Sequence, residues 1–278
     1  MEMSGKVIAE EILSDVRERI SKLNEKGTIP ELAIVTVGGE EAWLSYVSQK
    51  LKTAERLGIK TQLTKLDGNS EEELLNTIEQ LNKDKNVHGI IVQRPIPKQF
   101  DRRKVIEGIA PLKDIDGFRD DSIYIVPVLL AIQRFIREAY GVLTASELEK
   151  VLINQSICVA GKGETAGGPT IEWLQALKIP FKVIDSKTTD VESILKHSNL
   201  VICAVGKSNV IKPEFLSKGV KLIGVGTHKE DGKLKGDYNV EEIKDIASAW
   251  SPTPGGVGPV NLAYLFQNLI AACEKQTH

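Results

Sequence analysis

The sequence predicts an α/β protein with two lobes: an N-terminal α/β lobe and a Rossmann-like lobe built on a parallel sheet. Three observations predict this fold class. Strand-like and helix-like segments alternate through residues 6–93, a second alternation runs through 156–225, and a last helical pattern follows a Pro/Gly-rich stretch. That last helix is expected to return to the first lobe. The length of 278 residues suits two domains of ordinary size.

The first alternation is read from apolar periodicity and from capping signals. The expected elements are a helix over 6–24, strands at 32–37 and 60–66, a helix over 41–57 with Gly58 after its end, a helix from the capping residues Ser70 and Glu73 through Leu81, and a strand over 88–93. Such regular alternation is typical of a parallel sheet with crossover helices.

The second alternation follows a turn at 113–118, a helix from Pro127 through Arg137 and a capping box formed by Thr144 and Glu147. The expected elements are strands at 156–160, 181–185, 199–205 and 220–225, helices over 168–177 and 190–197, a short helix after Pro213 and a turn at Asp231-Gly232. The expected domains are 1–118 with 250–278 and, separately, 140–249, joined by a helical connection over 119–139.

Composition excludes several classes of protein. The net charge of −2 gives no reason to expect nucleic acid or an anionic membrane surface as a partner. The start of the chain lacks the pattern of a signal peptide, and the longest nearly apolar run, residues 123–132, is too short to span a bilayer. The three cysteines and four histidines show no metal-ligand spacing, so no metal site is expected. These features together predict a cytoplasmic protein.

A glycine-rich turn is the first candidate binding site. Gly161, Gly163 and Gly167 follow an apolar strand and precede a helix, with the spacing G-x-G-x-x-x-G. Glycines allow backbone N–H groups to approach a phosphate, and a helix N-terminus favours negative charge. The turn therefore suggests dinucleotide binding, although the spacing is one residue longer than usual and an ordinary strand-to-helix turn remains the alternative.

A second set of residues has side chains that could carry chemistry. Tyr46 and Lys50 share one helix face, and that helix begins beyond the carboxyl end of a strand. Gln93 ends another strand at the same edge, and Asp116 lies in a later turn, so the four side chains are expected to converge. The alternatives are a solvated Lys50, a Tyr46 packed at a rim and a Gln93 that caps a loop.

The stretch from Ser251 to Pro259 contains three prolines and three glycines. Prolines restrict the backbone and glycines permit close approach, so this segment is expected to have a fixed shape that could wall a planar ligand. An interdomain turn is the alternative.

Taken together, these motifs resemble the bifunctional methylenetetrahydrofolate dehydrogenase/methenyltetrahydrofolate cyclohydrolase family. The matching segments span almost the whole chain in the family's order. They are Gly5-Lys6 with Ala9, Tyr46 to Lys52, Val92 to Pro97, Lys113 to Phe118, Gly161 to Pro169, Ser186 to Thr188, Ala204 to Lys207 and Pro252 to Pro259.

The resemblance implies an NADP-dependent enzyme that acts on tetrahydrofolate derivatives, as a homodimer, with both ligands in a cleft between two lobes. Lys50 would be the catalytic proton carrier, oriented by Gln93, while Tyr46 would pack on the folate and Asp116 would hold the pterin. The remaining implied residues are Pro254, Gly255, Gly256 and Val257 for the substrate, and Gly161, Lys162, Gly163, Gly167, Ser186, Lys187 and Thr227 for the coenzyme.

The sequence also departs from the family pattern. Gly163 stands where Ser is usual, Lys162 where Arg is common, Asp185 where His is usual, Gly224 where Asp is usual, and Arg94 where the family has an apolar residue. The segment between Phe118 and Pro127 is short and lacks the family's Thr-Pro pair. The alternatives are therefore a dehydrogenase without cyclohydrolase activity, linked to NADP or to NAD, and a non-catalytic NADP- and folate-binding module.

The choice of coenzyme depends on the charges near the second strand of the dinucleotide lobe. Lys162, Ser186 and Lys187 favour a 2′-phosphate, whereas Asp185 could bind a ribose hydroxyl and so favour NAD. Two cations outweigh one carboxylate if Asp185 points away or pairs with a lysine, and on that condition the sequence predicts NADP.

Overall fold

The computed structural model describes residues 1–38, 44–208 and 210–277 and divides the chain into two compact units. One unit comprises Glu11–Pro127 with Leu262–His278, and the other comprises Met1–Glu10 with Val128–Asn261. The long helices α1 (Gly5–Glu25) and α10 (Val257–Gln276) each begin in the second unit and end in the first. The functional boundaries expected from the sequence remain a prediction, and each unit is described by itself.

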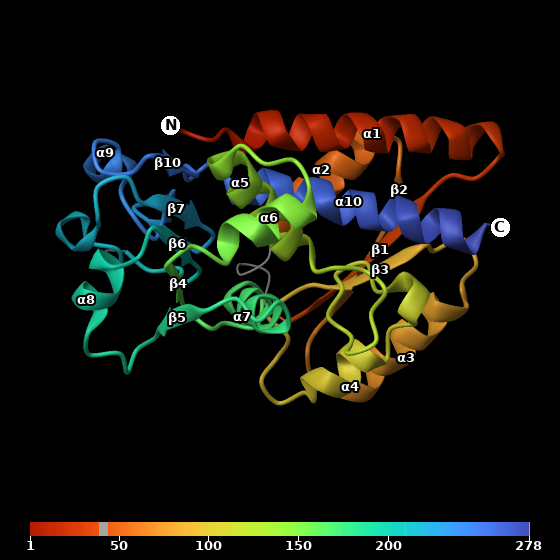
Figure 1. Ribbon diagram of the computed structural model, residues 1–278. Helices are drawn as coiled ribbons and strands as arrows, with labels where there is room; N and C mark the ends of the chain where they lie inside the picture. Colours follow the sequence, from red (N-terminus) through yellow and green to blue (C-terminus); the bar gives the residue numbers. More distant parts are fainter. Residues whose placement is uncertain (39–43, 209, 278) are drawn as a thin grey trace. The chain divides into compact units, whose positions relative to one another are not determined.

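The first unit is built on a three-stranded parallel sheet in the order β2-β1-β3 (Figure 1). Its strands are β1 (Glu31–Val37), β2 (Lys60–Leu66) and β3 (Gly89–Val92). Leu32 of β1 is in register with Gly89 of β3, and Val35 with Val92. The carboxyl ends of all three strands therefore meet at one edge, which is where ligands bind in parallel α/β sheets.

Helices cover both faces of this sheet: α2 (Leu44–Leu57), α3 (Glu71–Lys83) and α4 (Arg102–Glu107), together with α1 and α10. Apolar residues of α3 and α4 pack on the face of β1 that presents Ala33, Val35 and Val37. Gly89 of β3 faces the opposite side of the sheet. A Cβ at this position would lie 2.7 Å from Leu269 of α10. Glycine at this position therefore allows α10 to lie directly on the sheet.

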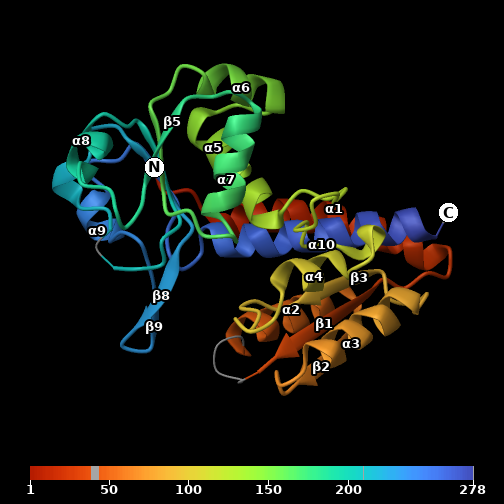
Figure 2. The same ribbon diagram turned by 90° about the horizontal axis from the view of Figure 1, so that it is seen from below.

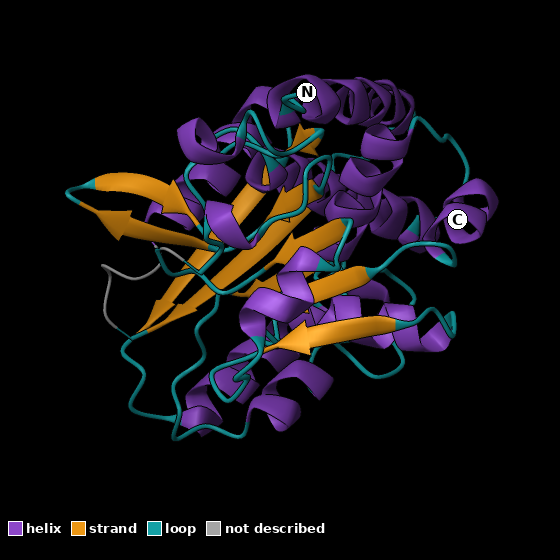
Figure 3. Ribbon diagram, turned by 60° about the vertical axis from the view of Figure 1, so that its left-hand side comes forward, coloured by secondary structure: helices purple, strands orange, loops and turns teal. Residues whose placement is uncertain are grey.

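The second unit contains five parallel strands in the order β10-β7-β6-β4-β5 (Figure 3). They are β4 (Ile157–Ala160), β5 (Phe181–Ile184), β6 (Leu200–Cys203), β7 (Lys221–Gly224) and β10 (Ala249–Trp250). The chain moves from β4 to one neighbour, β5, and then returns to the other, β6. This reversal creates a switch point between β4 and β6, which is the expected ligand crevice of such a sheet.

The rest of the second unit consists of connecting helices and one hairpin. The helices are α5 (Pro127–Tyr140), α6 (Ala145–Leu152), α7 (Gly167–Ala176), α8 (Val191–Lys196), a 3₁₀ turn (Pro213–Phe215) and α9 (Val240–Ile243). The antiparallel strands β8 (Thr227–Glu230) and β9 (Lys233–Gly236) form the blue hairpin of Figure 2. Asp231 and Gly232 both have positive φ, as a two-residue hairpin turn requires.

The α/β fold class is confirmed, and every strand expected from the sequence is present within one or two residues of its expected bounds. The expected helix over 41–57 is observed from Leu44, and its residues 41–43 lie outside the described part of the chain. The short elements β10 and α9 were not expected. Within the described ranges, no helix has the length and apolar character needed to cross a membrane.

Candidate active site

Lys50 and Gln93 meet at the carboxyl edge of the three-stranded sheet, as their positions on α2 and after β3 predicted. The Lys50 Nζ donates a hydrogen bond to Gln93 Oε1 over 2.8 Å, and Gln93 Nε2 donates to the backbone oxygen of Arg94 over 2.9 Å. Gln93 is buried. Both ends of its amide are engaged, so the orientation of the oxygen toward Lys50 is fixed.

The charge state of Lys50 is set by its surroundings. The amine is enclosed by protein, and burial lowers its pKa below the usual lysine value because desolvation disfavours the ammonium form. The Asp116 carboxylate opposes this effect, while the Arg94 guanidinium adds to it. Lys50 is therefore not the solvated surface lysine of the alternative reading.

The turn that carries Asp116 is held by its two neighbours Lys113 and Asp114. Lys113 is buried, and its amine donates to the backbone oxygens of Leu81, Asn82 and Asp84 at 2.7–2.9 Å, which caps the carboxyl end of α3. Asp114 is also buried, and its carboxylate accepts the backbone N–H groups of residues 117, 118 and 119. The side chains of Lys113 and Asp114 therefore stabilise the turn itself. The half-buried Asp116 is the carboxylate whose charge raises the pKa of Lys50.

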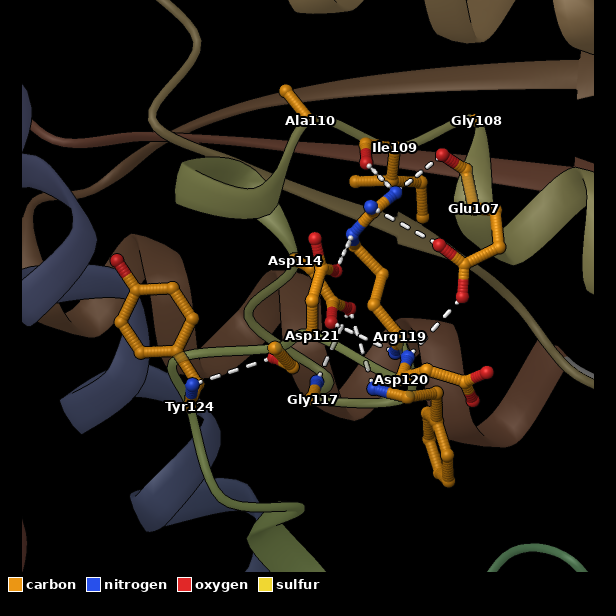
Figure 4. A network of polar contacts seen from close by, with 12 residues as sticks. Glu107, Gly108, Ile109, Ala110, Asp114, Gly117, Arg119, Asp120, Asp121 and Tyr124 are labelled. Atoms are coloured by element: carbon orange, nitrogen blue, oxygen red, sulfur yellow. Dashed lines mark hydrogen bonds and ion pairs between the residues drawn. The ribbon is translucent and has the colours of Figure 1, made fainter.

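The short segment after Phe118 is ordered by Arg119 (Figure 4). The guanidinium of Arg119 donates to the backbone oxygens of Glu107 and Ile109, and it forms ion pairs with the carboxylates of Glu107 at 3.0 Å and Asp121 at 2.7 Å. Its side chain is only 10% exposed. The contacts of Arg119 thus hold the segment after Phe118 in place. This segment has a defined structure although it lacks the Thr-Pro pair that is usual in the family.

The amide of Asn268 on α10 connects the two ends of the same region. Its Nδ2 donates to the backbone oxygens of Ile115 at 2.9 Å and Ile125 at 3.0 Å. Gly117, between these two residues, has φ +71°, and a Cβ there would lie 2.6 Å from Tyr124 O. Only glycine fits this crossing of the two backbone segments.

Tyr46 lies one helical turn before Lys50 on α2, and its side chain is 51% exposed. This position places an aromatic ring on the same helix face as the amine, as the spacing predicted. An exposed ring beside a buried amine is suited to packing against a planar ligand.

In the second unit, the glycine turn after β4 has the shape expected of a phosphate cradle. Gly161 has φ +91°, and a Cβ there would lie 2.5 Å from Ala204 O, at the end of β6. A Cβ at Gly167 would lie 2.2 Å from Gly161 O, whereas a Cβ at Gly163 would meet nothing within 4 Å. Gly161 and Gly167 are therefore required by the backbone, but Gly163 is not.

The helix that follows this turn, α7, has no side-chain cap at its N-terminus. Of the N–H groups in its first turn, which have no earlier carbonyl within the helix, that of Gly168 donates to the backbone oxygen of Gly163 over 2.8 Å. The cradle at the switch point and the uncapped helix together fit a dinucleotide diphosphate.

Asp185 at the end of β5 is paired rather than pointed at an open ribose position. Its carboxylate contacts Lys162 Nζ at 2.6 Å and accepts the backbone N–H of Lys187 at 2.9 Å. The pKa of Asp185 is lowered to about 2, and the hydrogen bond from Lys162 is the main cause. Ser186 and Lys187 are exposed directly after it, so the pairing on which the NADP prediction depended is present.

The Pro/Gly segment after β10 has a fixed shape. The buried Ser251 accepts Gly224 N–H at its hydroxyl, over 2.8 Å, and its backbone oxygen accepts the Tyr238 hydroxyl, over 2.6 Å. A Cβ at Gly256 would lie 2.3 Å from Pro252 O. Pro254 is exposed, Gly255 has φ +97°, and Val257 is buried as the first residue of α10.

The departure from the family pattern at Gly224 has a physical reason in this segment. A Cβ at Gly224 would lie 3.0 Å from the ring of Tyr238, which is buried. The tyrosine ring occupies the space that a larger side chain at position 224 would need. The backbone N–H of Gly224 donates to the hydroxyl groups of Tyr238, over 3.1 Å, and Ser251, over 2.8 Å.

Asp237 was missed in the sequence, although it organises the loop after β6. Its side chain is 0% exposed and accepts the backbone N–H groups of Val205, Gly206 and Lys207, the second of these at 2.6 Å. A Cβ at Gly226 would lie 2.2 Å from Asp237 Oδ2. The glycine thus makes room for the carboxylate, and half-buried Thr227, a predicted coenzyme residue, follows it at the start of β8.

Comparisons with known proteins agree with this geometry. Two family models match the chain: the catalytic domain of tetrahydrofolate dehydrogenase/cyclohydrolase over residues 3–116, and the NAD(P)-binding domain of the same family over residues 139–277. The bifunctional protein FolD of Lysinibacillus sphaericus is 37% identical over 278 residues, covering 99% of this chain and 97% of the relative.

Solved structures show the same similarity. A FolD methylenetetrahydrofolate dehydrogenase/cyclohydrolase from Campylobacter jejuni has a TM-score of 0.89 at 29% identity and covers 99% of both chains. The enzyme from Trypanosoma brucei, solved with NADP and an inhibitor, has a TM-score of 0.88 at 25% identity and covers 99% of this chain and 97% of its own. The chain therefore belongs to the tetrahydrofolate dehydrogenase/cyclohydrolase family.

Proposed function

We propose that this protein oxidises 5,10-methylenetetrahydrofolate to 5,10-methenyltetrahydrofolate with NADP and hydrolyses that product to 10-formyltetrahydrofolate. Family membership supports both activities. The observation that carries the assignment in this chain is the enclosed Lys50 amine, bonded to Gln93 and facing the charge of Asp116. A binding module without catalysis would have no use for such an amine.

The oxidation requires positioning more than acid–base chemistry. A hydride leaves the methylene carbon that bridges two nitrogens, and their lone pairs stabilise the cation that remains. NADP, when bound, accepts that hydride. In this proposal Tyr46, Asp116 and the segment from Pro254 through Gly255 and Gly256 to Val257 hold the folate, and the Gly161–Gly167 turn holds the coenzyme phosphates.

The hydrolysis requires proton transfers. Water adds to the methenyl carbon and loses one proton, which leaves a hydroxyl group on that carbon. The bond from the carbon to N5 then breaks as the hydroxyl loses its proton to become the formyl oxygen and N5 takes up a proton, so that one proton is released overall. Burial lowers the pKa of Lys50 below that of a solvated lysine, so a larger share of the amine is neutral and able to accept a proton and return it. Gln93 keeps its nitrogen aimed, so we assign Lys50 as the proton carrier and Gln93 as its positioning residue.

The coenzyme assignment to NADP rests on the charges after β5. The ion pair with Lys162 removes Asp185 as a free acceptor for a ribose hydroxyl. Ser186 and Lys187 are exposed beside it and can contact a 2′-phosphate. The bound NADP in the Trypanosoma brucei relative supports the same choice.

The test of this function follows methenyl absorbance and coenzyme reduction together in Lys50→Met. Methionine keeps much of the packing but cannot carry a proton. A positioned acid–base group contributes ~10²–10⁴-fold, so hydrolysis should fall by about that factor while oxidation falls much less, and methenyltetrahydrofolate should accumulate.

An equal loss of both activities in Lys50→Met would mean that Lys50 binds substrate rather than moving protons. No loss of either would refute the site. Lys83→Met is a matched control at an exposed lysine of α3, and it should leave both activities near the parent values. Running the parent assay with NAD as well decides the coenzyme.

We also propose a homodimer, as the family resemblance implies. Strand β2 lies at the outer edge of its sheet, and beside it α2 and β2 line a pocket of about 480 Å³ whose apolar lining includes the half-buried Leu51 and Leu63 and the buried Ile59. A second copy of the chain would cover this edge and its apolar lining. Light scattering should give twice the chain mass, and Leu63→Arg should return the mass to that of one chain.

We place the enzyme in the cytoplasm. Cys158, Cys203 and Cys273 are all unpaired and buried, as befits a reducing compartment. Its partners would be tetrahydrofolate derivatives rather than nucleic acid or membrane. Fractionation of the source cells checks this placement.

A further inference from the structure

Arg94 lies directly after Gln93 and next to the amine site, by which we mean Lys50, Gln93 and Asp116. Its Cζ lies 3.8 Å from the centroid of the Phe118 ring, a close cation–π distance. Phe118 is itself fixed, because its backbone N–H is one of the three that Asp114 accepts. The guanidinium is therefore stacked on the turn that carries Asp116.

The same residue also takes part in the hydrogen-bond chain that ends at Lys50. The backbone oxygen of Arg94 accepts Gln93 Nε2 over 2.9 Å, and Gln93 Oε1 accepts Lys50 Nζ over 2.8 Å. The backbone of Arg94 thus orients the partner of the amine, while its side chain lies over the neighbouring turn.

Within the part of the chain that the structure describes, two charged groups, Asp116 and Arg94, act on the Lys50 amine, and they act in opposite directions. The Asp116 carboxylate favours the ammonium, whereas a guanidinium disfavours a second positive charge nearby. An arginine keeps its charge at any physiological pH. The charge of Arg94 therefore opposes that of Asp116 at every physiological pH. Like burial, it favours the neutral form of the Lys50 amine.

We propose that Arg94 is a tuning residue for the proton carrier: stacked on Phe118, its guanidinium keeps a fixed positive charge beside Lys50 and sets the pH range over which that amine exchanges protons. This inference rests on the proposed role of Lys50. It adds a role for Arg94 to those proposed for Lys50, Gln93 and Asp116.

The proposal is tested without relying on turnover, by competitive acetylation of Lys50 as a function of pH in the ligand-free enzyme. Only the neutral amine reacts, so the pH of half-maximal labelling reports the Lys50 equilibrium. Removing a neighbouring like charge favours the ammonium. Arg94→Leu should therefore shift that pH upward by about 0.5–1 unit, since one unit corresponds to a tenfold change in the equilibrium.

Three further variants separate charge from packing. Arg94→Lys keeps a positive charge and should shift the labelling less than Arg94→Leu. Phe118→Leu removes the stack that fixes the guanidinium and should also give a partial upward shift. Arg103→Leu, which removes an exposed arginine paired with Asp120, should leave the labelling unchanged.

An unchanged or lowered half-labelling pH in Arg94→Leu would overturn the inference, provided that circular dichroism shows a folded protein. So would an equal shift in Arg103→Leu. The pH profile of methenyltetrahydrofolate hydrolysis is measured in parallel. A shift of labelling without a shift of that profile would support the tuning by Arg94 and reject the proposed proton-carrying role of Lys50, so the two failures are distinguishable.

Discussion

The amine site of the three-stranded unit and the glycine turn of the five-stranded unit achieve binding chemistry in different ways. At the amine site the working atoms belong to side chains, and burial tunes their charge, as at Lys50. At the glycine turn the working atoms belong to the backbone, and the charged side chains near it, Lys162 and Lys187, are exposed. Substitutions should therefore be most harmful where they change a buried charge or the backbone shape, and least harmful at the exposed cations.

The largest effect in the glycine turn is expected from Gly167→Ala. The added Cβ would lie 2.2 Å from Gly161 O, which is backbone and cannot move without deforming the turn. A displacement of about 1 Å at a positioned group can cost on the order of 10²-fold, so NADP-dependent oxidation should fall by about that factor. Hydrolysis of supplied methenyltetrahydrofolate needs no coenzyme and should fall much less.

Gly163→Ala is the matched control for this substitution. The space around its Cβ is open to 4 Å, so the kinetic constants for NADP should change by less than about twofold. Similar losses in the two variants would show that glycine content rather than backbone shape matters at this turn, and the comparison of the two sites would fail.

The next effect is expected at Gln93, on the side-chain side of the comparison. Gln93→Ala removes the acceptor of the Lys50 amine. A hydrogen bond to a charged group is worth about 1.5–3 kcal/mol, so hydrolysis should slow by roughly 10-fold or more, with a smaller change in oxidation. Gln99→Ala is a suitable control because it removes a glutamine whose amide donates to the backbone oxygen of Gly68, over 3.2 Å, which is a different partner from Lys50.

The fold and most of the amine site could be predicted because their signals are local. Periodicity identifies strands, and parallel strands bring their carboxyl ends to one edge, which placed Gln93 beside Lys50. The two residues of β10 are too few for any period. Their identification requires the pairing with β7, in which Ala249 is in register with Lys221 and Trp250 with Leu222.

Asp237 could not be predicted for a related reason. In the sequence it follows a charged hairpin and resembles a surface acid. In the fold it is fully buried and binds a loop that precedes it by about thirty residues. A signal was present in Gly226, whose missing side chain leaves the space that Asp237 fills, but only coordinates connect the two.

Asp237→Asn is therefore expected to have an intermediate effect. An amide has one oxygen, so it cannot accept the three backbone N–H groups that the carboxylate holds. The loop after β6 should loosen next to Gly161, raising the KM for NADP by roughly 10-fold, in line with about 1–2 kcal/mol for a lost buried hydrogen bond. Steady-state kinetics should show kcat for hydrolysis nearly unchanged, and Asp120→Asn, at an exposed carboxylate, should be silent.

The smallest effects are expected at the exposed cations. The ion pair between Lys162 and Asp185 is short, at 2.6 Å, but the Lys162 side chain is 64% exposed. Surface pairs of this kind contribute little to stability, so Lys162→Ala should leave the melting temperature nearly unchanged. Its loss would, however, free Asp185 to accept a ribose hydroxyl, and the preference for NADP over NAD should narrow.

Lys187→Ala should act on the phosphate alone. Lys187 forms part of the turn through its backbone N–H, which the substitution retains. We therefore expect a few-fold rise in the KM for NADP, consistent with about 1 kcal/mol for a solvent-screened charge, and almost no change in the KM for NAD. The difference should shrink as salt is raised, because the Debye length falls to about 3 Å at 1 M. An equal rise in the KM for both coenzymes would mean that Lys187 stabilises the backbone turn rather than binding the phosphate. Lys187 would then act as Gly161 and Gly167 do, through the shape of the backbone.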